Sequence, residues 1–147
     1  MPNGLVSVKF IQNKFNSDKY IELLKTFAIP IMNLNYKSYW FVQDNASIHA
    51  SKKVVQYLSG EITTLAWPSK SPDLNIMENV WKMLSDLVYN ECQPRNNAEL
   101  KERILRAVET LNRDQRQTVI GLYQSFRCRL TKLLLLNGSI INKKDNM

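Results

Sequence analysis

Two carboxylates are the strongest candidates for a catalytic role in this sequence. Asp44 follows the apolar residues 39–42, and Glu78 stands near the start of a long amphipathic segment. A hard divalent cation such as Mg²⁺ takes oxygen ligands, and proteins usually hold it with few carboxylates plus substrate phosphates. A pair of such ions can activate a water or hydroxyl and stabilise the leaving oxygen of a phosphodiester. Asp44 and Glu78 are therefore candidate metal ligands of a phosphodiester-cleaving site.

Each of these residues also has a purely structural interpretation. Asn75 and Glu78 are spaced much like a capping box, and the spacing alone favours that role. Asp44 and Asn45 after a strand can form a simple Asx turn, an interpretation as well supported as metal binding. His49 is the only histidine, and a histidine in such a segment is more typical of a hydrogen-bonded turn than of a ligand. The spacing alone leaves these alternatives open.

Alternating strands and helices must position these residues. Residues 5–11, 39–42 and 62–66 are apolar or β-branched runs and predict three strands, the second buried on both faces. A helix capped by Asp18 or Ser17 is predicted between the first two and ends near Pro30. A short helix through Val54 and Leu58 separates the last two. Parallel pairing gathers ligand sites at the carboxyl ends of strands, which is where Asp44 stands.

The second half of the chain is predicted to be helical. A loop over residues 67–75 contains two prolines, and an amphipathic helix follows over residues 76–89, with Trp67 and Trp81 as packing anchors. A second helix around residues 100–111 is supported by two acid–base pairs at i,i+4, Glu99 with Arg103 and Glu102 with Arg106. A third runs from Val119 to a stop at residues 137–138, which are Asn and Gly.

Composition indicates one globular domain without a membrane anchor. The 147 residues are 44% hydrophobic and 22% charged, a balance that can bury a core. No apolar run approaches the roughly 18 residues of a membrane span, and no secretory pattern opens the chain. Two cysteines and one histidine complete neither a four-ligand zinc site nor a disulfide framework, so a reducing compartment is expected. We predict one domain over residues 1–138 and a frayed tail over 139–147.

The net charge of +7 is concentrated in the last third of the chain. Residues 92–147 carry eleven Lys and Arg against five Asp and Glu, which leaves six of the seven net charges there. A basic surface favours a polyanionic partner, most commonly nucleic acid, although this charge is also compatible with solubility alone.

Two strings of residues resemble the catalytic core of Tc/mariner superfamily transposases. The first, QDNASIH, spans residues 43–49, and the second, WPSKSPDLNIMENVW, spans residues 67–81. The family pattern is QDN-x-x-x-H followed by WPSQSPDLNPIE-x-x-W, and Ile76 stands where the family usually has proline. Weaker similarity covers residues 4–20 and the basic helices up to Gly138. The resemblance therefore extends over almost the whole chain.

That resemblance implies an α/β fold, an RNase H-like mixed sheet flanked by helices, here truncated at its N-terminus and helical in its C-terminal part. It implies a Mg²⁺- or Mn²⁺-dependent acidic triad that hydrolyses DNA at transposon ends and joins the freed 3′-hydroxyl to a target. Asp44 would be the second acidic residue and Glu78 the third, both as metal ligands, with Asp73 in a loop. In the family the first acidic residue lies on a strand upstream of the segment that matches residues 4–11, so it is expected to be missing here. Asp18 cannot substitute for it, because Asp18 opens a helix. We therefore expect a fragment of the catalytic domain that is inactive alone.

The resemblance implies that the partner is DNA, both as transposon ends and as target. It also implies a homodimer of the full-length protein and a nuclear location, and no membrane partner is expected. The residues predicted to contact DNA are Asn45, His49, Lys70, Arg127 and Arg129.

A domesticated, non-catalytic module is the alternative function. Such a protein would keep the fold and bind DNA or a partner protein through its basic helices. Salt-dependent DNA binding without metal dependence would favour it, because phosphate neutralisation by Lys and Arg releases counterions. Another RNase H-like nuclease ranks third, because it would share the carboxylates but not the WPS-x-SPDLN string.

Overall fold

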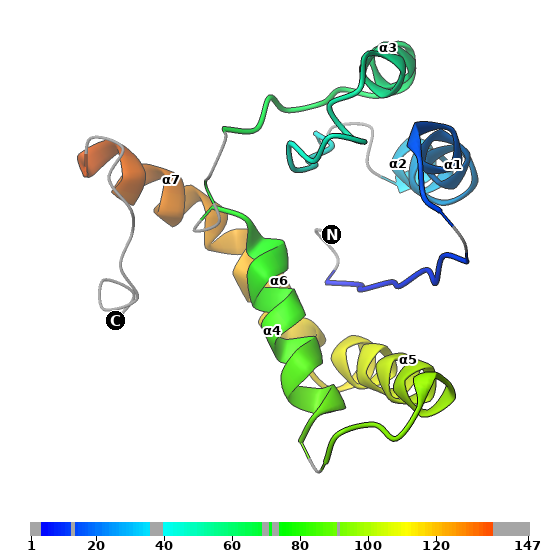
Figure 1. Ribbon diagram of the computed structural model, residues 1–147. Helices are drawn as coiled ribbons and strands as arrows, with labels where there is room; N and C mark the ends of the chain where they lie inside the picture. Colours follow the sequence, from blue (N-terminus) through cyan, green and yellow to red (C-terminus); the bar gives the residue numbers. More distant parts are fainter. Residues whose placement is uncertain are drawn as a thin grey trace. The chain divides into compact units, whose positions relative to one another are not determined.

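The structure is a computed structural model, which describes residues 4–12, 14–35, 40–68, 71, 74–90 and 92–136. The chain divides into two compact units, residues 10–70 and residues 1–9 with 71–147. The described residues are mainly helical (Figure 1). None of their helices is both long and apolar enough to cross a membrane.

A helical segment with a π turn at its centre opens the unit of residues 10–70. It comprises α1 (Ser17–Leu23), the π-helix η1 (Leu24–Ala28) and α2 (Ile29–Asn35) without a break. The N-cap is Asn16, whose Oδ1 accepts the Lys19 N–H at 3.0 Å, so the predicted cap at Asp18 or Ser17 is wrong. The predicted end near Pro30 is also wrong. The Ile29 N–H donates to the carbonyl of Leu24, and this wide turn accommodates the missing N–H of Pro30 within the helix.

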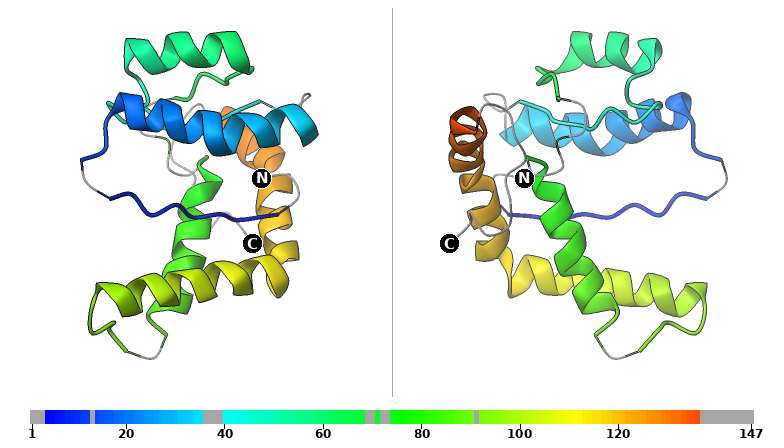
Figure 2. Two further views of the ribbon diagram at one scale, coloured as in Figure 1. Left: turned by 90° about the vertical axis from the view of Figure 1, so that its right-hand side faces the viewer. Right: turned by 60° about the vertical axis from the view of Figure 1, so that its left-hand side comes forward.

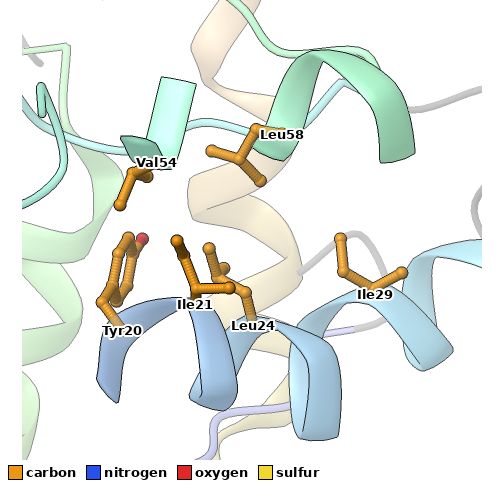
Figure 3. Packing of buried hydrophobic residues seen from close by; sticks show 6 residues of the cluster. All are labelled: Tyr20, Ile21, Leu24, Ile29, Val54 and Leu58. Atoms are coloured by element: carbon orange, nitrogen blue, oxygen red, sulfur yellow. The ribbon is translucent and has the colours of Figure 1, made fainter. Parts of the chain in front are cut away.

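The short helix predicted through Val54 and Leu58 is confirmed as α3 (Lys52–Glu61), which packs beside α1. Four side chains of the first helical segment point toward two from α3 and form a buried apolar cluster (Figure 3). Its members are Tyr20, Ile21, Leu24, Ile29, Val54 and Leu58. This cluster is the core of the unit.

The predicted strands at residues 39–42 and 62–66 are represented by one parallel bridge, between Phe41 and Thr64. The Phe41 N–H donates to the Thr63 carbonyl at 2.8 Å, and the Leu65 N–H donates to the Phe41 carbonyl at 2.9 Å. The expected parallel direction is therefore present. The described residues contain no strand longer than this bridge. Two short strands without further neighbours are marginally stable, which accounts for the short pairing.

The second unit is built from α4 (Ile76–Val88), α5 (Asn97–Arg113), α6 (Arg116–Gln124) and α7 (Phe126–Leu135). The α4 and α6 helices rise from the same side of α5 (Figure 2), and both pack against it. The predictions of α4 and α5 are confirmed. Val80, Leu84 and Val88 of α4 form the core with Ala107 and Leu111 of α5 and Val119 of α6.

Trp81 is not the packing anchor that the sequence predicts. Its side chain is 56% exposed, because the buried stripe of α4 follows Val80, Leu84 and Val88 at intervals of four residues. The single helix predicted from Val119 onward is also interrupted, at Ser125. The Ser125 hydroxyl donates to the Leu122 carbonyl at 2.7 Å, a local bond that competes with the backbone ladder.

The predicted first strand, at residues 5–11, is not formed. The Val6 N–H donates to Asn112 Oδ1 at 2.7 Å, and Asn112 Nδ2 donates to the Val6 carbonyl at 2.9 Å. The side-chain amide of Asn112 on α5 thus occupies the backbone groups that a neighbouring strand would use. The mixed sheet expected from the sequence is accordingly absent from the described residues. One domain over residues 1–138 stays a prediction, and the predicted helix stop and tail lie outside the described ranges.

Candidate functional site

Asp44 lies three residues after the bridged Phe41, in a tight turn. Its Oδ1 accepts the Ala46 N–H at 3.1 Å and lies 2.5 Å from His49 Nδ1. The first contact is the Asx turn that the sequence leaves open, and the second is an ion pair when the imidazole is protonated. The Asp44 side chain is 58% exposed, and its Oδ2 makes no hydrogen bond within the described residues. Asp44 therefore combines a fixed oxygen with an accessible one.

His49 is held by the residues that surround this turn. Its ring packs on the ring of Tyr20 with the centroids 4.4 Å apart, and its backbone carbonyl accepts a hydrogen bond from Gln43 Nε2 at 3.3 Å. The Tyr20 hydroxyl donates to Gln43 Oε1 at 2.8 Å. These contacts join α1 to the turn. The sequence motif includes Gln43, Asp44 and His49, but sequence reasoning missed Tyr20 as part of the site.

The electrostatics of the turn favour an ionised Asp44. The hydrogen bond from the Ala46 N–H, and after it the contact with His49, hold the pKa of Asp44 below its ordinary value despite some desolvation. Burial, and then the charge of Asp44, raise the pKa of Tyr20 to about 12. At neutral pH the carboxylate is charged and the tyrosine hydroxyl keeps its proton.

Two of the residues predicted to contact DNA lie beside this turn. Asn45 Nδ2 donates to the Trp67 carbonyl at 2.9 Å, so Asn45 links the two motif strings. His49 faces Asp44 through Nδ1. Their DNA contacts stay predictions, and Lys70 lies outside the described residues, as does Asp73.

Glu78 is exposed in the first turn of α4. The N-cap Asn75 accepts the Met77 N–H at 3.1 Å, and the Glu78 N–H donates to the Asn75 carbonyl at 3.1 Å. The reciprocal bonds of a capping box are therefore not made. Within the described part of the chain the Glu78 carboxylate makes no hydrogen bond or ion pair. Asp44 belongs to the unit of residues 10–70 and Glu78 to the other unit, so their joint action stays a prediction.

Arg129 of α7 connects this helix to the start of α4. Its Nη1 donates to Asn79 Oδ1 at 3.1 Å and its Nε to Ser125 Oγ at 3.2 Å. Asn79 directly follows Glu78, so the Arg129 guanidinium is hydrogen-bonded to the residue next to Glu78. Arg127 is exposed, and its side chain makes no hydrogen bond or ion pair within the described residues. The DNA contacts of both arginines stay predictions.

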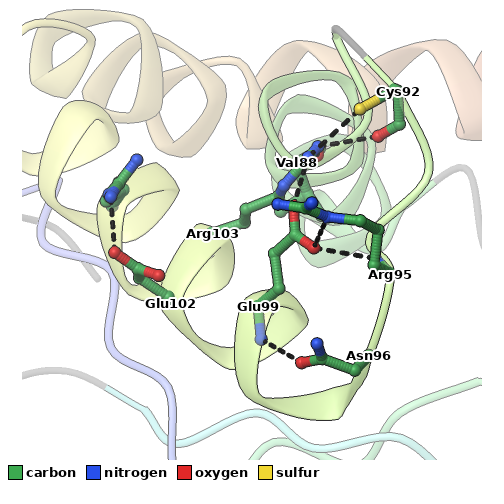
Figure 4. Close-up of polar contacts among 8 residues, drawn as sticks. Val88, Cys92, Arg95, Asn96, Glu99, Glu102 and Arg103 are labelled. Atoms are coloured by element: carbon green, nitrogen blue, oxygen red, sulfur yellow. Dashed lines mark hydrogen bonds and ion pairs between the residues drawn. The ribbon is translucent and has the colours of Figure 1, made fainter.

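The arginines of α5 are largely engaged with acids. The predicted Glu99–Arg103 and Glu102–Arg106 pairs are confirmed. Arg103 also donates to the carbonyls of Val88 and Cys92, at 3.2 and 2.7 Å, and so fastens the turn after α4 (Figure 4). The sequence identifies only the helical pair, because Cys92 lies eleven residues before Arg103.

The donor types suit a hard divalent cation. Asp44 and Glu78 each present carboxylate oxygen to solvent, the chemistry that Mg²⁺ and Mn²⁺ accept. In the ranges that the structure describes, no three His, Cys, Asp or Glu side chains are grouped closely enough to hold a metal ion.

Residues 2–101 match the protein family described as DDE superfamily endonuclease, a range that includes both Asp44 and Glu78. The chain is 33% identical over 141 residues to the transposable element Tc3 transposase of Caenorhabditis elegans, which covers 93% of this chain and 42% of that protein. It is 35% identical over 71 residues to the transposable element Tcb1 transposase of Caenorhabditis briggsae, which covers 46% of this chain and 26% of that protein. The chain spans less than half the length of these curated relatives.

Proposed function

This chain belongs to the DDE superfamily of endonucleases, and from that premise we propose that Asp44 and Glu78 are two acidic residues of a metal-dependent DNA-cleaving site. The family match across both residues carries the proposal. The similarity to the Tc3 and Tcb1 transposases supports DNA transposition as the reaction. In this proposal the full protein cleaves DNA at transposon ends and transfers the strand to target DNA. Membership of the family implies an RNase H-like fold.

The two carboxylates have separate supporting observations. The Oδ1 atom of Asp44 is held by Ala46 and His49, which leaves Oδ2 for a cation, and the low pKa keeps the group ionised. Glu78 is exposed and is not engaged in capping its helix. Mg²⁺ or Mn²⁺, when bound, supplies a Lewis acid that activates water and stabilises the leaving oxygen.

We also propose that these 147 residues do not complete the metal site alone. The motif strings account for the second and third acidic residues only. Asp18 lies in the first turn of α1 and pairs with Lys53, which supports excluding it as the first acid. In this proposal another segment of the protein supplies that residue.

A cleavage assay tests the incomplete site. The 147-residue chain is incubated with DNA carrying transposon ends and with Mg²⁺ or Mn²⁺, and no specific cleavage is expected. Specific strand cleavage that Asp44→Asn abolishes would contradict the proposal. The genomic DNA upstream of the Met1 codon, read in frame, checks whether a strand-like segment ending in aspartate is encoded there.

Mn²⁺ titration tests the role of Asp44 without DNA. Paramagnetic Mn²⁺ is expected to broaden the NMR signals of residues 44–49 in the wild-type chain and much less in Asp44→Asn. Glu61→Gln is the matched control, because it removes another exposed carboxylate of the same unit. Equal broadening in wild type and Asp44→Asn would exclude Asp44 as a ligand.

A non-catalytic DNA-binding function is the second candidate, and the charge of α7 favours it. This helix carries Arg127, Arg129 and Lys132 and no acid, whereas the α5 arginines are paired with acids. We expect Arg127→Gln to weaken DNA binding and to reduce its salt dependence by about one counterion, while Arg106→Gln leaves both unchanged. Binding that persists unchanged in EDTA would favour this function over catalysis. A nuclear location and a homodimer of the full-length protein remain parts of the proposal.

A further inference from the structure

The Asp44 turn is attached to the core of its unit through Tyr20. Tyr20 belongs to the buried cluster with Val54 and Leu58 (Figure 3). Its side chain also contacts the Asp44 turn in two ways. The hydroxyl donates to Gln43 Oε1 at 2.8 Å, and the ring packs on that of His49 at 4.4 Å. A residue of α1 thus contacts the residue before Asp44 and the imidazole that faces Asp44.

We propose that Tyr20 is a positioning residue for the Asp44 carboxylate and acts through Gln43 and His49. The inference rests on the proposed function of Asp44 as an acidic residue of the site. Without such support an aspartate this exposed would rotate freely about its side-chain bonds, and a metal ligand needs a fixed direction.

The hydrogen bonds fix the direction of each group in turn. Gln43 Nε2 donates to the His49 carbonyl at 3.3 Å, so the amide oxygen must face Tyr20, and the tyrosine must donate. The Gln43 amide holds the backbone of His49, while the Tyr20 ring holds its imidazole plane. The imidazole then directs Nδ1 at Asp44 Oδ1, 2.5 Å away.

The burial of Tyr20 makes this arrangement persistent. A buried tyrosine hydroxyl needs a hydrogen-bond partner, because leaving it unpaired is costly. The raised pKa of Tyr20, about 12, keeps the proton that the bond to Gln43 requires. The core of the unit therefore holds the Asp44 turn in one conformation.

Proton exchange at the His49 ring tests the proposal on the full 147-residue chain. His49 is the only histidine, so every imidazole N–H signal belongs to it. We expect a protected Nδ1–H signal in the wild type, because that proton bonds to Asp44. Tyr20→Phe retains the ring and removes only the hydroxyl, and exchange is expected to become about tenfold faster.

Two further variants separate positioning from a general loss of stability. Tyr57→Phe removes a hydroxyl from another tyrosine packed against the same cluster, and exchange at His49 should not change. Gln43→Met should accelerate exchange as Tyr20→Phe does, and the two changes together should add no more than either alone.

Each outcome decides the proposal. The proposal would be overturned if His49 exchange in Tyr20→Phe stayed at the wild-type rate, or if Tyr57→Phe accelerated it as much. Fully additive effects of Tyr20→Phe and Gln43→Met would also overturn it. The readout uses neither metal nor DNA. Equal Mn²⁺ broadening in wild type and Asp44→Asn would therefore contradict the proposed role of Asp44 as a metal ligand and leave its positioning by Tyr20 standing. Unchanged exchange in Tyr20→Phe would overturn the positioning and leave the proposed function standing.

Discussion

Glu78 and Asn75 have different roles although they stand only three residues apart. Asn75 caps α4 through its side chain, whereas the Glu78 carboxylate has no partner in the described residues. We expect Asn75→Ala to lower the free energy of unfolding by about 1 kcal/mol and Glu78→Gln to change it by less than about 0.5 kcal/mol. Urea denaturation followed by circular dichroism measures both. A large loss in Glu78→Gln would instead indicate the capping box.

Glu99 makes stability depend on pH in the acid range. The Arg95 N–H, then the Arg103 guanidinium and then the Arg95 side chain, lower the pKa of Glu99 from 4.5 to about 2. The lowered pKa means that its stabilising contribution is complete above pH 4.5 and is lost as the pH falls toward 2.

Thermal unfolding across that range checks the effect. The melting temperature of wild type should fall with decreasing pH more steeply than that of Glu99→Gln. Glu102→Gln serves as the control, because among the described residues Glu102 pairs only with the exposed Arg106. Parallel curves for wild type and Glu99→Gln would show that the Arg95 and Arg103 contacts contribute nothing.

The candidate site could be predicted from the sequence only where it is local. Asp44, Asn45 and His49 lie within one string, so their turn can be anticipated from residue types. Tyr20 could not be assigned to the site, because it stands 23 residues before Gln43 and its position in the helical apolar pattern predicts only a core residue. The spacing of Asn75 and Glu78 favours a capping box, and that interpretation is wrong. The spacing does not reveal which N–H the Asn75 oxygen accepts.

At the scale of elements, Gly4 shows how closely the extended segment lies against α6. Gly4 has φ +72, and a Cβ there would lie 2.7 Å from the Arg116 carbonyl oxygen. We expect Gly4→Ala to destabilise the chain by about 1–2 kcal/mol through strain and crowding. Urea denaturation measures the loss.

Gly121 provides the matched control. It lies within α6, and a Cβ there would meet nothing within 4 Å. Gly121→Ala should therefore stabilise the same unit by about 0.5–1 kcal/mol through helix propensity. Destabilisation of equal size by both substitutions would contradict the close approach at Gly4.

A helix could be predicted from the sequence where the spacing of apolar residues and the residues at its ends are sufficient to define it. The apolar stripe of α4 and the acid–base pairs of α5 are local, and both helices form as expected. The break at Ser125 was not predictable, because it depends on a hydroxyl bonding to the Leu122 carbonyl within an unbroken apolar pattern. The strand at residues 5–11 was wrong because a strand requires neighbours, and Val6 bonds to the Asn112 side chain instead.

At the scale of the whole molecule, each compact unit has its own buried cluster. Leu24 is fully buried in residues 10–70, and Leu111 is fully buried in the other unit. We expect Leu111→Ala to cost about 2–5 kcal/mol and to reduce amide protection mainly in α4, α5 and α6. Leu24→Ala should act mainly on α1 and α3. Hydrogen exchange with mass spectrometry maps both, and equal loss throughout the chain in either variant would indicate a single cooperative core.

The exposure of the tryptophans has a practical consequence for following this protein in solution. Trp40 is 61% exposed and Trp81 is 56% exposed, and they lie in different units. Because these two indoles already contact water, denaturation should shift their emission only slightly, so any larger shift would come from Trp67, which is half-buried. The same exposure makes both indoles accessible to collisional quenchers, and Trp81 lies one helical turn after Glu78 on α4. Iodide quenching in the double variant Trp40→Phe/Trp67→Phe would therefore report on the surface beside Glu78 without a contribution from residues 10–70.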